Sequence, residues 1–314
     1  CCYYVARRKR IMIVSVWGIE GSGKSTLGLS FPRPLFHQEL DIGGFDRAIW
    51  KLEDSAKKAG EELRIHQCEA KEDIKEIDWR KWDIVTKPYI TPVQIEKLIG
   101  LQQKAGVTVR FSREVKGVKE VWQEIVIDTV NVGQVPIVKT IMADSATQLW
   151  WIAHTGFLQE KQEIQMAQGM RVTDKDFRER LQPVEFPNNR MREIIYTVKS
   201  MGKHYVMTHY PKDIYANRVT ERGIESYATG EVSPDGFKHT VELDDLVIWC
   251  YAEEDKRREI IKGVANPDYS KPVPRAKISL KCGLSGMGMK AVGLELPMPS
   301  YEGLMELQKL MRGE

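Results

Sequence analysis

The 314 residues carry 47 basic and 44 acidic side chains, a formal net charge of +3, and 42% of them are hydrophobic. This near balance excludes the global positive field of a polycationic nucleic-acid-binding protein, so any such contact must come from local patches. The five cysteines form no C-x-x-C pair, and no second ligand pair accompanies His66 and Cys68. We therefore expect a reduced, cytoplasmic protein without structural zinc.

The organisation expected from composition is one large domain with an insertion. Residues 1–10 are expected to form a solvated leader, residues 11–290 the domain, with an insertion at about 45–116, and residues 291–314 a C-terminal tail or helix. No apolar stretch approaches the roughly 20 residues that span a bilayer, so we expect no membrane contact.

The first expected element is a buried strand over Ile11–Trp17, which leads into a glycine-rich loop and a helix. Residues 18–25 match G-x-x-x-x-G-K-[ST], the phosphate-binding loop, and both flanking elements that the loop needs are present. The pattern predicts that the chain binds ATP with Mg²⁺. Lys24 would reach the β and γ phosphates, and Ser25 would offer its hydroxyl to the ion. The residues expected around the nucleotide are Gly18, Glu20, Gly21, Ser22, Gly23, Lys24, Ser25 and Thr26.

A second short strand is expected over residues 33–41, and it ends in the carboxylates Glu39 and Asp41 before a glycine turn. Residues 45–82 are charged and partly helical in spacing, which favours an excursion from the core. Asp83–Tyr89 could be another strand.

Two segments compete to supply the acidic residue on the metal side of the nucleotide, ending in Asp128 or in Asp144. An apolar strand that ends in Asp would place the carboxylate beside a Mg²⁺ ion held by Ser25. We favour Asp144, because Pro136 starts its strand and a helical run follows Ser145. Asp128 could instead be a polar residue on a helix.

The next expected elements are an amphipathic helix over Asn188–Met201 and a strand over Lys203–Tyr210. The Thr-His end of that strand is where α/β NTPases place a residue that senses the γ-phosphate, which would be His209. The alternative is a histidine satisfied by the backbone at a strand end. Short strands near residues 246–251, 259–261 and 276–280 predict an antiparallel extension of the sheet.

In this order of motifs the chain resembles the RecA-like ATPases, specifically the compact phage-type RecA-fold ATPases linked to single-strand annealing and recombination. The segments that carry the resemblance are Gly18–Thr26, Glu39–Gly44, Ala143–Thr147 and Met207–His209, with weaker matches at 230–238 and 244–245. The resemblance implies an α/β, RecA-like P-loop NTPase fold. Such a fold has a mostly parallel central sheet, helices on both faces and a C-terminal antiparallel extension.

The resemblance also implies a catalytic carboxylate that polarises a water for attack on the γ-phosphate. Asp41 occupies the matching position, and Glu39 is the alternative, because its side chain is longer and alternation puts both on one face of the strand. A homo-oligomer with the ATP site near a subunit interface is implied too, with a basic residue from the neighbour. Arg275, Lys277 and Lys281 are the candidates for that residue, or else solvated groups on a strand edge.

Single-stranded DNA is the expected partner, bound by the stretch 211–240. The residues suited to phosphate contacts and base stacking there are Lys212, Tyr215, Arg218, Arg222, Tyr227, Phe237 and Lys238. The same stretch contains Glu221, Glu225, Glu231 and Asp235, so a plain hairpin with mixed surface charge stays open.

The leading functional hypothesis is thus an ATPase that acts on single-stranded DNA in phage recombination or replication. A packaging motor that translocates duplex DNA is the first alternative, although Ser145 stands where that class favours a carboxylate. A small-molecule kinase would need an arginine-rich lid and an acceptor site. A non-hydrolysing nucleotide switch is the alternative outside enzymes.

Overall fold

The computed structural model describes residues 11–41, 43–69, 72–90, 117–169, 185–220, 223–237, 239–254 and 272–314. The expected leader, the strand near 259–261, Arg222 and Lys238 lie outside these residues. In the described part of the chain, no helix is both long and apolar enough to cross a membrane.

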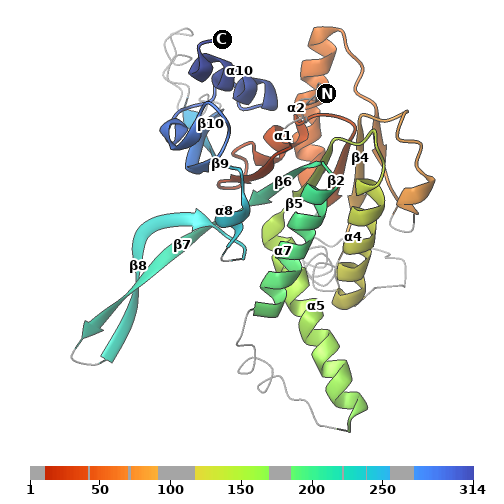
Figure 1. The fold of residues 1–314 in the computed structure, drawn as a ribbon, viewed down its shortest axis with the longest axis vertical. Helices are drawn as coiled ribbons and strands as arrows, with labels where there is room; N and C mark the ends of the chain where they lie inside the picture. The colour runs from red at the N-terminus through yellow and green to blue at the C-terminus, as the bar shows by residue number, and fades with distance from the viewer. Residues whose placement is uncertain are drawn as a thin grey trace, which may run out of the picture.

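An eight-stranded sheet runs through the centre of the molecule, in the order β10-β9-β1-β6-β5-β2-β4-β3 (Figure 1). Its strands are β1 (Ile13–Trp17), β2 (Leu35–Glu39), β3 (Ile65–Gln67), β4 (Ile84–Pro88), β5 (Thr140–Asp144), β6 (His204–His209), β9 (Leu246–Glu254) and β10 (Pro272–Cys282). All neighbours pair in parallel except β9 and β10, which are antiparallel. The predicted α/β architecture, with a mostly parallel central sheet and an antiparallel C-terminal extension, is confirmed.

Helices cover both faces of the sheet and give it two hydrophobic cores. They are α1 (Lys24–Leu29), α2 (Gly44–Ala59), α4 (Val118–Gly133), α5 (Ala146–Ala167), α7 (Glu185–Ser200), α8 (Thr240–Leu243) and α10 (Tyr301–Arg312), with the 3-10 turns η1 (Ile74–Glu76) and η3 (Gly288–Ala291). Ile141 of β5 packs in the core under α4, α5 and α7, and the next residue, Met142, packs in the core under α1, α2 and α10. Because side chains alternate along a strand, a strand covered on both faces reads as a continuous apolar run.

The described part of the expected insertion does not leave the core. α2 packs against α1, while β4 pairs with β2 and carries β3 as the edge strand. Ile84, Val85 and Thr86 of β4 are buried, so this segment widens the sheet. The segment around Asp128 lies in α4, which shows that its helical spacing, and not its apolar run, decides its structure.

A two-stranded ribbon, β7 (Pro211–Thr220) and β8 (Gly223–Pro234), leaves the core directly after β6 and projects away from it (Figure 1). Its strands pair with each other from Pro211↔Pro234 to Thr220↔Gly223. At its base, Thr147 of α5 donates its hydroxyl to the carbonyl of Asp235 and accepts a hydrogen bond from the backbone N–H of Tyr210. One side chain therefore holds both ends of the ribbon.

Candidate nucleotide-binding site

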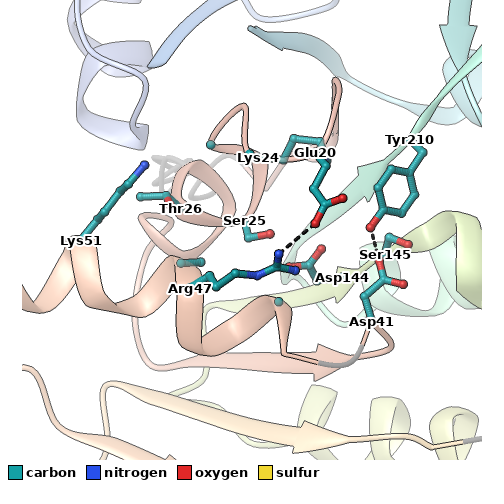
Figure 2. Close-up of a pocket in the computed structure, with 14 residues that line it drawn as sticks. Glu20, Lys24, Ser25, Thr26, Asp41, Arg47, Lys51, Asp144, Ser145 and Tyr210 are labelled. Atoms are coloured by element: carbon teal, nitrogen blue, oxygen red, sulfur yellow. Dashed lines mark hydrogen bonds and ion pairs between the residues drawn. The ribbon is translucent and has the colours of Figure 1, made fainter. Parts of the chain in front are cut away.

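A pocket of about 340 Å³ opens where β1, β2 and β5 end (Figure 2). In open α/β sheets, ligands bind in the crevice beyond the carboxyl ends of the parallel strands, and this pocket has that position. Its lining residues are Glu20, Gly21, Gly23, Lys24, Ser25, Thr26, Asp41, Gly44, Arg47, Ala48, Lys51, Asp144, Ser145 and Tyr210.

The glycines of the loop are required by space and by backbone conformation. A Cβ on Gly18 would lie 2.1 Å from the carbonyl oxygen of Cys250, so no side chain fits there. Gly21 and Gly23 have φ angles of 76° and 93°, in the left-handed region that other residues rarely adopt. Gly23 is also the N-cap of α1, so the loop turns directly into the helix that bears Lys24 and Ser25.

The ammonium group of Lys24 is held across its own loop. Its Nζ atom donates to the carbonyl oxygens of Gly18 at 2.9 Å and Ile19 at 2.8 Å, and lies 4.9 Å from the ring centre of Tyr210. Burial lowers the pKa of Lys24, while the negative charges of Asp144 and Asp41 act in the opposite direction. Phosphate oxygens can replace the two carbonyl acceptors, so the lysine is placed to bind an anion that enters the pocket.

Asp144 ends β5 and lies beside Ser25 in a polar cluster. Thr208 donates a hydrogen bond to its Oδ1 atom, and the Nε2 atom of His37 lies 3.5 Å from its Oδ2 atom. Burial alone would raise the pKa of the Asp144 carboxyl, but His37, Ser25 and Thr208 outweigh it and hold the pKa below its usual range. The group is therefore ionised at neutral pH. The peptide bond that joins it to Ser145 is cis.

The donor set of Ser25 and Asp144 fits Mg²⁺. This ion prefers oxygen ligands and takes only one or two from the protein when phosphates complete its shell. The Oδ2 atom of Asp144 is buried and lies 3.5 Å from the Nε2 atom of His37, a long contact that leaves it lone-pair capacity for a cation. Asp128, the alternative, lies on α4, where Lys87 donates to it at 2.7 Å and Tyr89 at 2.8 Å, and it does not line the pocket.

Asp41 faces the pocket from the turn after β2. The hydroxyl of Tyr210 donates to its Oδ2 atom at 3.1 Å (Figure 2). Burial raises the pKa of Asp41, and the charge of Asp144 adds to this, while the hydrogen bonds with Ser145 and Tyr210 oppose it. A carboxylate with a raised pKa at the edge of a phosphate pocket has the properties of a general base.

Glu39 does not share this position. β2 ends at Glu39, so the strand alternation that would put both carboxylates on one face does not continue to Asp41. The Oε1 atom of Glu39 accepts from the backbone N–H of Phe45 at 3.4 Å, and the residue does not line the pocket. Its carboxylate therefore lies at the first turn of α2, where burial outweighs the hydrogen bonds from the backbone of Phe45 and Gly43 and raises its pKa.

His209 is buried behind the pocket and does not line it. Its Nε2 atom lies 3.0 Å from the Ser15 hydroxyl and its Nδ1 atom 2.8 Å from the carbonyl oxygen of Asp235. Burial lowers its pKa to about 4. Both ring nitrogens of His209 therefore have hydrogen-bond partners outside the pocket. These contacts match the alternative of a histidine satisfied at the end of a strand.

The three basic residues considered for a role across a subunit interface lie on β10, outside the pocket. Arg275 pairs with Glu253 at 3.1 Å, Lys277 lies 4.4 Å from the ring centre of Trp249, and Lys281 donates to backbone carbonyls. Their strand nonetheless passes close to the loop, because a Cβ on Gly23 would lie 3.4 Å from Pro274.

The sequence analysis did not predict that Arg47, Lys51 and Tyr210 line the pocket. Arg47 and Lys51 lie one turn apart on α2, and Arg47 reaches across the pocket to Glu20 at 2.8 Å (Figure 2). The i, i+4 spacing of Arg47 and Lys51, just after Gly43 and Gly44, is the sequence feature that could have predicted two basic side chains on one face of a helix beside the pocket. Tyr210 directly follows the Thr-His end of β6, so the pocket residue of this strand stands one position beyond the expected one.

No protein-family model matches the chain, and no curated protein matches it in sequence. Among solved structures, it is similar to a KaiC-like protein from the hyperthermophilic archaeon Pyrococcus horikoshii, with 11% identity, a TM-score of 0.33, and 85% of this chain and 77% of that chain covered. It is also similar to the genome packaging NTPase of Sulfolobus turreted icosahedral virus 2 in complex with ATP-gammaS. That match has 12% identity, a TM-score of 0.32, and 80% and 81% coverage. At such TM-scores neither structure bears on what this chain binds or does.

Proposed function

We propose that this chain is a Mg²⁺-dependent ATPase that acts on single-stranded DNA. The observation that supports the enzymatic part is the convergence of Lys24, Ser25, Asp144 and Asp41 on one pocket at the ends of the parallel strands. A glycine-rich turn that only caps a helix would need none of these charges around it.

In the proposed mechanism the loop binds the phosphates through its backbone N–H groups, and Lys24 exchanges its carbonyl contacts for β- and γ-phosphate oxygens. Ser25 and Asp144 would hold Mg²⁺, which when bound neutralises charge on the phosphates. Asp41 accepts a proton from a water as the water oxygen bonds to the γ-phosphorus. The bond from the γ-phosphorus to its bridging oxygen breaks, and ADP leaves with that electron pair.

Tyr210 has two contacts that suit this reaction. Its hydroxyl orients the Asp41 carboxylate, and its ring lies over the Lys24 ammonium. If phosphate binding moves Asp41 or Lys24, the contacts of Tyr210 change as well. The next residue, Pro211, begins the ribbon.

The ribbon supports the DNA part of the proposal through its exposed aromatic side chains and its attachment. Tyr215 and Tyr227 are 64% and 45% exposed, and a tyrosine that contacts no core offers a face for a base to stack on. The ribbon begins at the pocket, so nucleotide state could alter its direction. Its charge does not add to this argument, because Lys212 and Arg218 are matched by Asp213, Glu225 and Glu231.

A homo-oligomer with the pocket near a subunit interface remains part of the proposal. Arg47 is exposed; it donates to the carbonyl oxygen of Gly43 and pairs across the pocket mouth with an exposed Glu20. A basic group from a neighbour could approach the γ-phosphate from that open side, and such a group raises phosphoryl-transfer rates strongly.

The test is the steady-state rate of ATP hydrolysis with no DNA, with single-stranded DNA and with duplex DNA. Stimulation by single strands alone is the expected result. Stimulation by duplex DNA would favour a translocating motor, and a DNA-independent rate would leave an ATPase with another partner. Tight ATP binding with no hydrolysis under any of the three conditions would favour a nucleotide switch and contradict the proposal.

A further inference from the structure

A cluster of three metal-ligating side chains lies at the edge strand of the sheet, apart from the nucleotide pocket. The ligand atoms of His66, Cys68 and Glu72 all lie within 4.8 Å of one another. His66 is in β3, Cys68 directly follows that strand, and Glu72 lies just before η1. The sequence analysis considered only His66 and Cys68; Glu72 lies near them with its backbone N–H donating to the carbonyl oxygen of Glu69.

The cluster is held in place by contacts that leave its donor atoms facing each other. The Oε1 atom of Glu72 lies 2.7 Å from the Nε2 atom of His66, and the backbone N–H of Glu69 donates to the other carboxylate oxygen at 3.2 Å. The backbone N–H of Cys68 donates to the carbonyl of Thr86 on β4 at 2.8 Å. The hydrogen bond from Glu69 is of the kind that orients a metal ligand, and the ring of His66 lies against Trp82, with 5.1 Å between the ring centres.

The spacing of the donors is close to that of a tetrahedral zinc site. Zn–S and Zn–N bonds of about 2.3 and about 2.0 Å put such ligand atoms about 3.5 Å apart. The side chains of His66 and Glu72 are 25% and 29% exposed, so both can move by the remaining distance and admit an ion from solvent. Cys68 is buried below them.

The surrounding charge favours a cation. Lys87 is the basic group beside the cluster, and its ammonium is shared by Asp128 at 2.7 Å and Glu124 at 3.1 Å. Lys87 reaches only the backbone carbonyl of Glu72, so it does not neutralise the Glu72 carboxylate. Burial raises the pKa of the Cys68 thiol to about 12, so an ion must displace the thiol proton when it binds.

We propose that His66, Cys68 and Glu72 bind a zinc-type divalent cation, with solvent in the fourth position. A nitrogen, a sulfur and a carboxylate oxygen form a ligand set suited to zinc and unsuited to Mg²⁺. The ion ties the turn before η1 to the edge strand β3. This inference differs from the expectation of a protein without structural zinc, and it is independent of the ATPase proposal.

The experiment titrates Co²⁺ alone into the full chain and follows the thiolate-to-metal charge-transfer absorption. The background is a Cys1→Ser, Cys2→Ser double variant, so that the terminal thiols cannot contribute. One equivalent of Co²⁺ should bind with the charge-transfer band, and Zn²⁺ should displace it. A Cys282→Ser variant, which removes another buried cysteine, is the matched control and should behave like the background.

Cys68→Ser should abolish the band, and His66→Gln and Glu72→Gln should each weaken Co²⁺ affinity by about tenfold or more. The two latter residues are partly exposed, so these variants test the site even if Cys68→Ser does not fold. Zn²⁺ should raise the melting temperature of the background chain and not that of the Cys68→Ser variant. Absence of stoichiometric binding in the background, or a band that persists in Cys68→Ser, would overturn the proposal.

Discussion

The nucleotide pocket and the β7–β8 ribbon are neighbours in the chain but opposite in construction. The pocket is formed by residues at the ends of strands that are buried on both faces, whereas the strands of the ribbon pair only with each other. The core thus fixes the positions of the pocket groups, while the ribbon offers a surface whose use depends on a partner. Substitutions in the pocket should change chemistry, and substitutions in the ribbon should change partner binding.

The largest expected effect comes from Lys24→Ala, which should abolish ATP hydrolysis, because a charge-assisted contact to the phosphates is lost in the ground state and in the transition state. Phosphate release and circular dichroism measure activity and fold. Lys58→Ala is the matched control, since Lys58 is an exposed lysine paired only with Asp54. ATP hydrolysis at a near-normal rate in Lys24→Ala would contradict the assignment of residues 18–25 as a phosphate-binding loop.

Asp41→Asn should lower kcat by about 10²–10⁴-fold, the range for loss of a general base, with a small change in ATP affinity. Glu39→Gln tests the alternative carboxylate. Its kcat should stay within a few-fold, because Glu39 does not line the pocket. The reverse ranking of the two kcat values would make Glu39 the base.

On the ribbon, the register separates the two exposed tyrosines. Tyr215 pairs with Ala228 and Ala216 pairs with Tyr227, so the two rings lie on opposite faces. Arg218 lies over Tyr227 at 5.7 Å and pairs with Glu225, which leaves the Tyr215 face free of this ion pair.

Tyr215→Ala should therefore cost about 1 to 3 kcal/mol of single-strand affinity. Tyr227→Ala is the matched control and should show a smaller loss.

The logarithm of single-strand affinity should fall with the logarithm of salt concentration, with a slope of about −0.7 per phosphate neutralised. Replacing Arg218 and Arg222 together should make that slope shallower. Fluorescence anisotropy measures both. ATP affinity without DNA should not change, and unaltered DNA binding in all variants would place the DNA surface elsewhere.

The smallest expected effect joins the two regions at Tyr210. Its hydroxyl stabilises the ionised form of Asp41, so Tyr210→Phe should raise the pKa of Asp41 further above its usual range. Because the ionised base is active, the acidic limb of the kcat/KM profile should move to higher pH, by up to about one unit. A limb that stays in place while the rate falls at every pH would mean that Tyr210 acts on Lys24 instead.

The phosphate loop could be predicted from the sequence because its requirements are local. Gly18, Gly23, Lys24 and Ser25 all lie in one short loop between a strand and a helix. The strand ending in Asp144 was favoured because Pro136 precedes it and a helical run follows Ser145. The ambiguity at Asp128 persisted because a short apolar run permits either a strand or a helix. Packing of Val121 and Ile125 into the core beneath the sheet decides it.

The remaining parts of the pocket depend on contacts that no local pattern contains. Tyr210 reaches Asp41 across 169 positions of the sequence, and Arg47 enters only because α2 lies beside the loop. β4 lies within the segment Asp83–Tyr89, where a strand was considered, whereas β3 was hidden in a charged segment because none of its three residues is buried. The end of β2 at Glu39 could not be foreseen from alternation, which assumes that the strand continues.

The most direct test of the central claim is a crystal structure of the chain with Mg²⁺ and a non-hydrolysable ATP analogue. We predict that the γ-phosphate contacts Lys24, that the ion binds Ser25 and Asp144, and that Asp41 faces the γ-phosphate. A nucleotide bound elsewhere, or an ion beside Asp128 with Asp144 remote from it, would contradict the account.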